Sequence, residues 1–150
     1  MLAHNRIAVM HGVNLDQLGR RDPAQYGGMD FARLEQAIGG WATELGLEAT
    51  FFQTNAEGEF VEHLHRLDGI ADAILLNPGA WTHYSWAIRD ALEIAALPAV
   101  EVHLSDVDNR EDFRRVSVIS DLCAGTVKGK GPEGYREALA LLRDQLSAPS

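Results

Sequence analysis

Polar side chains able to move protons or bind carboxylates follow the apolar runs of this sequence. Asn77 and His83 come after the run at 73–76, Ala-Ile-Leu-Leu, and His103 closes a later apolar run. Glu101 and His103 are separated by one residue, so in an extended strand both point to the same side and Glu101 could orient the imidazole. A purely structural role for Glu101 fits this spacing almost as well.

The run at 73–76 lacks polar alternation, which indicates a strand buried on both faces of a parallel sheet. Pro78-Gly79 then predicts a tight turn, and Thr82 or Ser85 is a candidate N-cap for a helix ending near Ala96. In a parallel sheet, ligands bind outside the carboxyl ends of the strands, where helix N-termini favour anionic groups. This turn is therefore the expected centre of the site.

Strand and helix patterns alternate along the 150 residues, which we expect to form one domain. Strands are predicted at 6–10, 47–53, 73–76, 97–105 and 123–127. Helices are predicted at 30–46, at 57–67, from Thr82 or Ser85 to near Ala96, and from Pro132 with Tyr135 facing inward. The alternation predicts an all-parallel five-stranded sheet with right-handed crossovers. The expected class is α/β, flavodoxin-like, with strand order 2-1-3-4-5.

A polar, glycine-bearing segment at about 14–28 shows neither helical nor strand periodicity. A connection of this length inside a compact domain is typical of an active-site lid or binding loop. A disordered linker is the alternative, and Leu15, Leu18 and Tyr26 argue against it. A helical turn over 109–115 would place Arg110 and Arg114 on one side.

The expected strand order brings this loop, the turn after Leu76 and the end of the fourth strand into one crevice. The side chains gathered there would be Asn14, Arg21, Tyr26, Asn77, His83, Glu101, His103, Ser105 and Arg114. Nucleophile-elbow and glycine-rich phosphate-loop motifs are absent from the sequence, which disfavours acyl transfer and nucleotide chemistry. Lys128 and Lys130 follow the last predicted strand, away from the crevice, so Schiff-base chemistry is not expected. Proton transfer with carboxylate recognition is the chemistry that fits.

The net charge and composition of the chain argue against several classes of binding partner. The net charge of −9 and pI near 5.0 argue against nucleic acid and anionic membranes as partners. Eleven arginines against two lysines suit bidentate carboxylate binding. A lone Cys123, no apolar run of membrane-spanning length and no apolar signal in residues 1–6 lead us to expect a cytoplasmic protein.

Motifs spread over nearly the whole chain resemble those of type II 3-dehydroquinate dehydratase. They are Asn14-Leu15, Gly19-Arg20-Arg21-Asp22-Pro23, Tyr26-Gly27, residues 51–55, Glu57-Gly58-Glu59, residues 77–80, Thr82-His83, Ser85, residues 89–91, residues 101–105, Arg110-Glu111 and Phe113-Arg114. The resemblance implies a flavodoxin-like hydro-lyase that removes water from 3-dehydroquinate by anti elimination through an enolate, giving 3-dehydroshikimate. It implies no metal, Schiff base or other cofactor, and a homododecamer built as a tetramer of trimers. The reaction could serve the shikimate pathway to aromatic amino acids or quinate catabolism.

The resemblance also assigns roles to single residues. Tyr26 would remove the C2 proton, Arg21 would stabilise its phenolate, and Asn14 would hold a water that stabilises the enolate. His103, oriented by Glu101, would protonate the leaving C1 hydroxyl. The residues that would bind substrate are Asn77, His83, Leu104, Ser105, Arg114 and, across a subunit boundary, Asp90.

One departure from the family pattern affects the site. The family usually has Asn-Gly-Pro-Asn where this chain has His11-Gly12-Val13-Asn14, so the turn that carries Asn14 loses the restraint of a proline. Trp81, Tyr84 and Trp86 would together expose more aromatic surface than a monomer normally does, which also predicts a homo-oligomer.

Two other readings compete with this assignment. A non-enzymatic flavodoxin-like module would bind a small carboxylate without turnover. A metal-dependent lyase would use His83, His103 and Glu101, although these residues lack a tight metal-ligand spacing.

Overall fold

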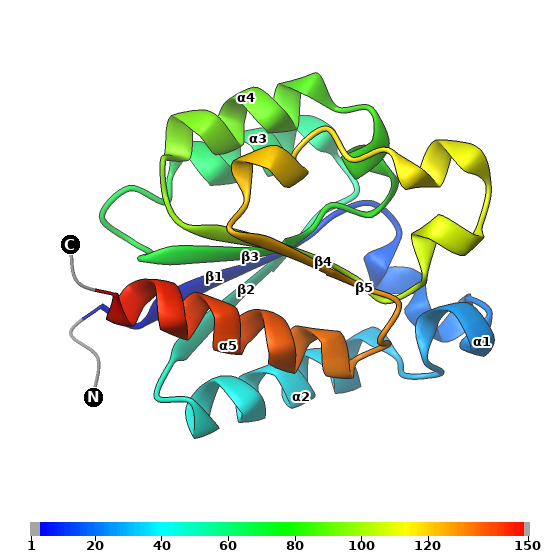
Figure 1. Ribbon diagram of the computed structural model, residues 1–150, viewed down its shortest axis with the longest axis horizontal. Helices are drawn as coiled ribbons and strands as arrows, with labels where there is room; N and C mark the ends of the chain where they lie inside the picture. The colour runs from blue at the N-terminus through cyan, green and yellow to red at the C-terminus, as the bar shows by residue number, and fades with distance from the viewer. Residues whose placement is uncertain (1–3, 149–150) are drawn as a thin grey trace.

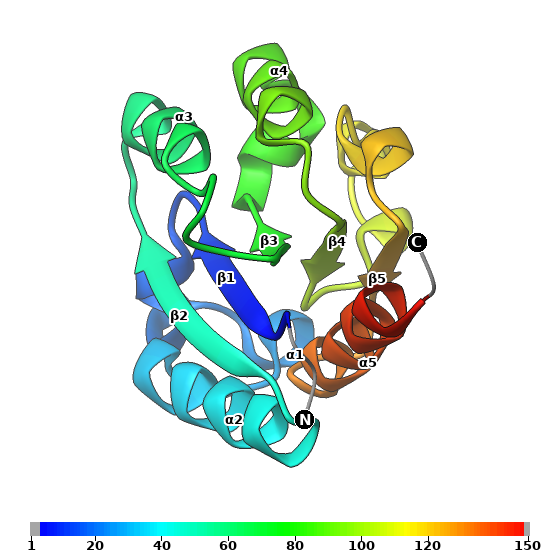
Figure 2. The ribbon, with the colours of Figure 1, turned by 90° about the vertical axis from the view of Figure 1, so that its left-hand side faces the viewer.

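A computed structural model describes residues 4–148, which form helices around a five-stranded, all-parallel sheet. The strands are β1 (Arg6–His11), β2 (Glu48–Gln53), β3 (Ala73–Asn77), β4 (Ala99–His103) and β5 (Gly125–Lys128). Their order is β2-β1-β3-β4-β5, which can be followed by the strand labels in Figure 2, where the sheet is viewed roughly end-on to the strands. The predicted flavodoxin-like topology is confirmed.

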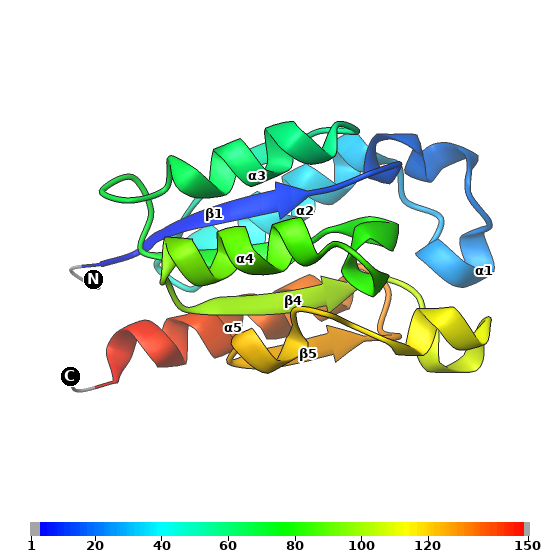
Figure 3. The ribbon, with the colours of Figure 1, turned by 90° about the horizontal axis from the view of Figure 1, so that it is seen from above.

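Helices cover both faces of the sheet (Figure 1). The helices that cover the sheet are α2 (Phe31–Glu44), α3 (Glu57–His65), α4 (Trp86–Ala95) and α5 (Glu133–Ser147), whereas α1 (Pro23–Tyr26) lies beyond the strand ends (Figure 3). Helices α2 and α5 pack on one face, and α3 and α4 on the other. Of the two candidate N-caps for α4, Ser85 is the cap, because its hydroxyl accepts the Ile88 backbone N–H.

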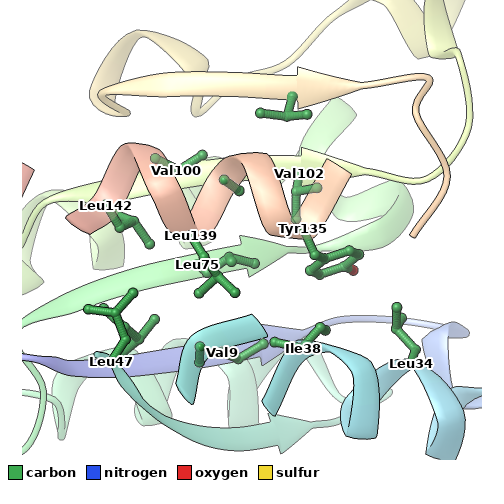
Figure 4. Close-up of a cluster of buried hydrophobic side chains, with 14 of the residues drawn as sticks. Val9, Leu34, Ile38, Leu47, Leu75, Val100, Val102, Tyr135, Leu139 and Leu142 are labelled. Atoms are coloured by element: carbon green, nitrogen blue, oxygen red, sulfur yellow. The ribbon is translucent and has the colours of Figure 1, made fainter. Parts of the chain in front are cut away.

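Side chains of successive strand residues alternate between the two faces. The buried residues on the α2/α5 face, many of them drawn in Figure 4, include Val9, Leu75, Val100 and Val102 against Leu34, Ile38, Leu139 and Leu142. The α3/α4 face buries Met10, Ile74 and Leu76 against Phe60, Leu64, Ile88 and Leu92. The same alternation directs the polar residues at the strand ends. His11 and Asn77 belong to the α2/α5 face, whereas Glu101 and His103 belong to the α3/α4 face.

The segment at 14–28 is more regular than its sequence indicated. Residues Leu15–Arg20 form a 3₁₀ helix, and Pro23–Tyr26 form α1, whose N-cap Asp22 accepts the Ala24 backbone N–H. Leu15 and Leu18 are buried in the core. The expectation of no periodic structure was wrong because the helical segments are too short to produce a repeating pattern.

The helical turn predicted over 109–115 was also wrong. Two 3₁₀ segments, Val107–Asn109 and Asp112–Arg115, flank Arg110, whose backbone is extended. Arg110 and Arg114 therefore do not share a helical face.

The three aromatic residues predicted on one surface separate in the structure. Trp81 is only 5% exposed and packs edge-on against Phe60, whereas Tyr84 and Trp86 are 59% and 65% exposed. Across residues 4–148, no helix is both long and apolar enough to cross a membrane.

Candidate active site

A cavity of about 120 Å³ opens at the carboxyl ends of the strands. Figure 3 shows α1 and the 107–116 segment beyond these strand ends, on the side away from the chain termini. The predicted site residues that line the cavity are Asn14, Arg21, Tyr26, Asn77, His83, His103, Leu104, Ser105 and Arg114. The topology thus brings together residues from three loops, as the sequence predicted.

Two turns approach closely to form one wall of the cavity. A Cβ atom added to Gly12, after β1, would lie 2.2 Å from the Pro78 carbonyl oxygen, after β3. The Gly12 N–H donates to the Asn77 carbonyl at 2.8 Å. Only glycine permits this approach, so Gly12 fixes the distance between the Asn14 turn and the Asn77 turn.

The phenol of Tyr26 lies between two arginines. Arg21 donates a hydrogen bond to its Oη, and Arg110 Nη1 donates to the same oxygen at 2.7 Å. The guanidinium carbons lie 4.2 Å and 5.4 Å from the centre of the Tyr26 ring. Arg110 also donates to Ser105 Oγ at 3.2 Å, so it connects the Tyr26 loop to the end of β4.

Arg110 is a cavity residue that sequence reasoning missed, although it lies in one of the motifs that carry the resemblance. It lines the cavity and donates to Tyr26 Oη, whereas Arg114 forms an ion pair through Nε with Glu111 at 2.7 Å. Arg114 still borders the cavity and remains available to a ligand.

Glu101 and His103 form a buried pair on β4. His103 Nε2 lies 2.6 Å from Glu101 Oε2, and the hydroxyls of Thr82 and Ser117 also donate to this carboxylate. Burial raises the pKa of Glu101, but the hydrogen bond and charge of His103, with the hydroxyls of Thr82 and Ser117, outweigh burial and leave the pKa below its usual value. Because Nε2 faces Glu101, Nδ1 is the ring nitrogen of His103 left for a ligand.

A hydrogen bond to the backbone sets which ring nitrogen of His83 carries the hydrogen. Its Nδ1 lies 2.7 Å from the Val116 carbonyl, which can only accept, so Nδ1 carries the hydrogen. Burial lowers the pKa of His83, as do the nearby charges of His103 and Arg114, against the opposing effect of the Val116 hydrogen bond. The neutral ring leaves Nε2 as an acceptor.

The Asn14 turn is held from β2 in place of the missing proline. Asn14 adopts a left-handed conformation with φ of 67°, and its backbone N–H donates to Asn55 Oδ1 at 2.8 Å. The Asn55 amide donates in turn to Asp16, and Gln53 donates to the Gly12 carbonyl at 3.3 Å. Side chains at the end of β2 and just after it thus restrain the turn.

Comparison with known proteins identifies this arrangement. The family model described as Dehydroquinase class II matches residues 5–143 of the chain. The chain belongs to this family. A 3-dehydroquinate dehydratase of Thermotoga neapolitana is 47% identical over 145 residues, which cover 97% of this chain and 99% of the relative. The 3-dehydroquinate dehydratase 2 of Pseudomonas putida is 49% identical over 134 residues, 89% of this chain and 90% of the relative.

Solved structures agree with the family assignment. The type II dehydroquinase from Propionibacterium acnes superposes with a TM-score of 0.88 at 38% identity, covering 95% of this chain and 99% of that chain. The type II dehydroquinase from Butyrivibrio crossotus gives a TM-score of 0.87 at 36% identity, covering 97% and 99%. The predicted membership in the type II dehydroquinases is therefore confirmed.

Two of the predicted site residues, Glu101 and Asp90, do not line this cavity. Glu101 is fully buried behind His103 and borders only a smaller hollow. Asp90 is exposed on α4 and does not border the cavity of its own chain. Lys128 ends β5 in register with His103 and forms a 2.8 Å ion pair with Asp108. As expected, it does not line the main cavity, but it borders the smaller hollow beside His103.

The described part of the chain, residues 4–148, contains no group of three or more His, Cys, Asp or Glu side chains arranged to hold a metal ion. His83, His103 and Glu101, the residues of the alternative metal site, instead bond to one another or to Val116 as described above.

Proposed function

We propose that this protein is a 3-dehydroquinate dehydratase, which converts 3-dehydroquinate to 3-dehydroshikimate and water. Family membership and relatives of that name support the substrate. The observation that carries the chemistry is the presence, at one cavity, of a phenol held by two guanidinium groups and an imidazole held by a carboxylate. An elimination needs one group to accept a proton from carbon and another to protonate the leaving hydroxyl.

In this proposal Tyr26 accepts the C2 proton as a phenolate. Arg21 and Arg110 both donate hydrogen bonds to its oxygen, and their positive charges would stabilise negative charge there during the reaction. The electrons of the broken C–H bond move into the adjacent ketone and form an enolate. Asn14, which borders the cavity, would hold the water that stabilises the enolate oxygen.

His103 then protonates the leaving C1 hydroxyl. The negative charge of Glu101 stabilises the imidazolium, and the bond to Nε2 fixes the ring plane. As the C–O bond breaks, water leaves and the enolate electrons form the new carbon–carbon double bond. Proton exchange with solvent returns Tyr26 to phenolate and His103 to imidazolium, so the reaction consumes no cofactor.

Substrate binding completes the assignment. Arg114 would bind the substrate carboxylate, for which a planar guanidinium is well matched. Asn77, His83, Leu104 and Ser105, which line the cavity together with Arg114, would bind the carboxylate and ring hydroxyls, and Leu104 and Ser105 would act in part through backbone N–H groups.

The functional unit in this proposal is a homododecamer of four trimers, in which Asp90 reaches the site of a neighbouring subunit. The exposure of Asp90 on α4, outside its own cavity, and the exposure of Tyr84 and Trp86 near the start of that helix support such a contact. Light scattering at micromolar concentration should give a mass of about twelve chains. A monomeric mass would contradict both the assembly and the role of Asp90.

The activity itself is tested by adding 3-dehydroquinate to the purified protein and following ultraviolet absorbance of the conjugated enone product. We expect absorbance to rise with enzyme concentration, and to rise equally fast after exhaustive chelation. Binding by calorimetry without any rise in absorbance would favour the non-enzymatic carboxylate-binding module. Loss of activity on chelation, restored by a metal, would favour the metal-dependent lyase.

A further inference from the structure

A second buried polar cluster lies beside the cavity, on the α2/α5 face of the sheet. It consists of His11 on β1, Asn77 on β3 and Tyr135 on α5, which are 0%, 3% and 0% exposed. His11 and Asn77 are neighbours in the β1–β3 register. Figure 4 shows Tyr135 projecting from α5, with its hydroxyl oxygen at the end of the ring nearest the strand carboxyl ends. The catalytic steps above use neither His11 nor Tyr135.

The orientation of the Asn77 carboxamide follows from its partners. The Gly79 backbone N–H, which can only donate, lies 3.1 Å from Asn77 Oδ1. The amide nitrogen must therefore be the atom that faces Tyr135 Oη, at 3.1 Å. One amide hydrogen donates to Tyr135, and the other is left for the cavity, which Asn77 lines.

The direction of hydrogen bonding continues from Tyr135 to His11. Since Tyr135 Oη accepts from Asn77, its own hydrogen is free to donate to His11 Nε2, 2.9 Å away. Burial lowers the pKa of His11 to about 3 and raises the pKa of Tyr135, so both groups are neutral near pH 7. A neutral His11 that accepts at Nε2 carries its hydrogen on Nδ1. That atom has no hydrogen-bond partner within residues 4–148.

We propose that Tyr135 and His11 are positioning residues of the active site, which hold the Asn77 carboxamide so that an N–H group faces an acceptor oxygen of the substrate. Without the Tyr135 hydroxyl, the Gly79 N–H would be the remaining group in the cluster that distinguishes the oxygen of the Asn77 carboxamide from its nitrogen. This inference rests on the proposed function for its kinetic test. It also gives a role to His11, which stands where the family usually has asparagine, because His11 Nε2 accepts a hydrogen bond from Tyr135.

The directed chain of hydrogen bonds is tested without substrate by nitrogen-15 NMR of the histidine rings. His11→Gln identifies the His11 signals by their loss. We expect a neutral ring protonated on Nδ1 between about pH 5 and pH 8, a range in which an exposed histidine titrates. An imidazolium, or a ring protonated on Nε2, would overturn the proposal whether or not the protein turns over 3-dehydroquinate.

The positioning of Asn77 is tested by a double-mutant cycle. Tyr135→Phe removes only the hydroxyl and should raise KM about threefold to tenfold, the size of one neutral hydrogen bond, with kcat nearly unchanged. In an Asn77→Ala background the same substitution should change KM by less than about twofold, because the residue it acts through is gone. An equal rise in both backgrounds, or no rise in either, would overturn the inference.

A matched control separates positioning from general loosening of α5. Leu142 is fully buried on the same helix, and Leu142→Val should lower the midpoint of urea unfolding without raising KM. If Leu142→Val raised KM as much as Tyr135→Phe does, the inference would fail. A wild-type protein without turnover would defeat the proposed function instead, and the NMR result would still decide the direction of the hydrogen bonds.

Discussion

The two sides of the cavity are built on different kinds of backbone. Tyr26 is the last residue of the four-residue helix α1, is half-buried, and is held through side-chain contacts with Arg21 and Arg110. His103 is 7% exposed and ends β4, a strand hydrogen-bonded to neighbours on both sides, with Glu101 fully buried behind it. The strand side of the cavity, formed by Glu101 and His103, is preorganised by the sheet. The loop side, formed by Tyr26, Arg21 and Arg110, depends on side-chain contacts that can open and re-form around a ligand.

This difference predicts two kinds of variant. On the loop side, substitutions should change the reaction rate and leave the free energy of unfolding nearly unchanged. On the strand side, they should change both, because the catalytic groups there are also part of a buried hydrogen-bond network.

The largest effect on the loop side is expected for Tyr26→Phe. Loss of the proton acceptor should lower kcat by about 10²-fold to 10⁴-fold, with little change in the urea midpoint. The enone absorbance assay and urea unfolding measure the two quantities. Tyr84→Phe, the same change outside the cavity, keeps the aromatic ring that the proposed subunit contact would use and should leave kcat unchanged. If Tyr26→Phe keeps more than about a tenth of kcat, Tyr26 is not the base.

A smaller loss of rate is expected when either arginine at the phenol is removed. Arg21→Met and Arg110→Met should each lower kcat by about tenfold to a hundredfold, because one donor still stabilises the phenolate. In a Tyr26→Phe background neither substitution should matter by more than about twofold. Arg115→Met, an exposed arginine that does not line the main cavity, is the control. Full activity of Arg110→Met would show that its contact with Tyr26 Oη has no part in catalysis.

On the strand side, Glu101→Gln should reduce stability as well as rate. The amide NH₂ would replace an oxygen that now accepts hydrogen bonds, at a cost of about 1–3 kcal/mol in the free energy of unfolding. Since the pKa of Glu101 is lowered in the folded state, its ionised form stabilises the fold above the unfolded pKa of about 4.3, and this stabilisation is lost as the pH falls through the lower folded pKa.

The stability gap between the wild type and Glu101→Gln should therefore shrink below about pH 4 in urea titrations. Glu93→Gln, on the exposed surface of α4, should show no gap at any pH. A gap that widens on acidification would mean that Glu101 is not an ionised acceptor in the folded protein.

The strand side is also the side that sequence predicted best. Unbroken apolar runs predicted the buried strands, and the alternation of strands with helices predicted their order. The two-residue period of a strand predicted that Glu101 and His103 lie on the same face. The residues around that pair were less predictable. Thr82 looked like an N-cap, but it bonds to Glu101 because the turn after β3 brings it over β4.

The loop side and α5 were harder to predict for a physical reason. The short 3₁₀ segments around Arg110 have no periodicity. Arg110 contacts Ser105 at the start of the same loop and Tyr26, which is distant in the chain, and the second contact could not be read from local sequence. For Tyr135 the helical spacing correctly predicted an inward side chain. It could not name His11 and Asn77 as partners, since these depend on how α5 lies across β1 and β3.

The central claim is that Tyr26 breaks the C–H bond and His103 completes the breaking of the C–O bond. The most direct test follows exchange of the C2 hydrogen of 3-dehydroquinate by NMR in deuterium oxide, with Tyr26→Phe and His103→Gln side by side. We predict that His103→Gln exchanges the C2 hydrogen faster than it forms product, because the half-buried Tyr26 can still take the proton and return a deuteron. Tyr26→Phe should slow exchange and dehydration together, each by about 10²-fold to 10⁴-fold relative to the wild type. Exchange at the wild-type rate by Tyr26→Phe, with none by His103→Gln, would contradict the account and assign the base to His103.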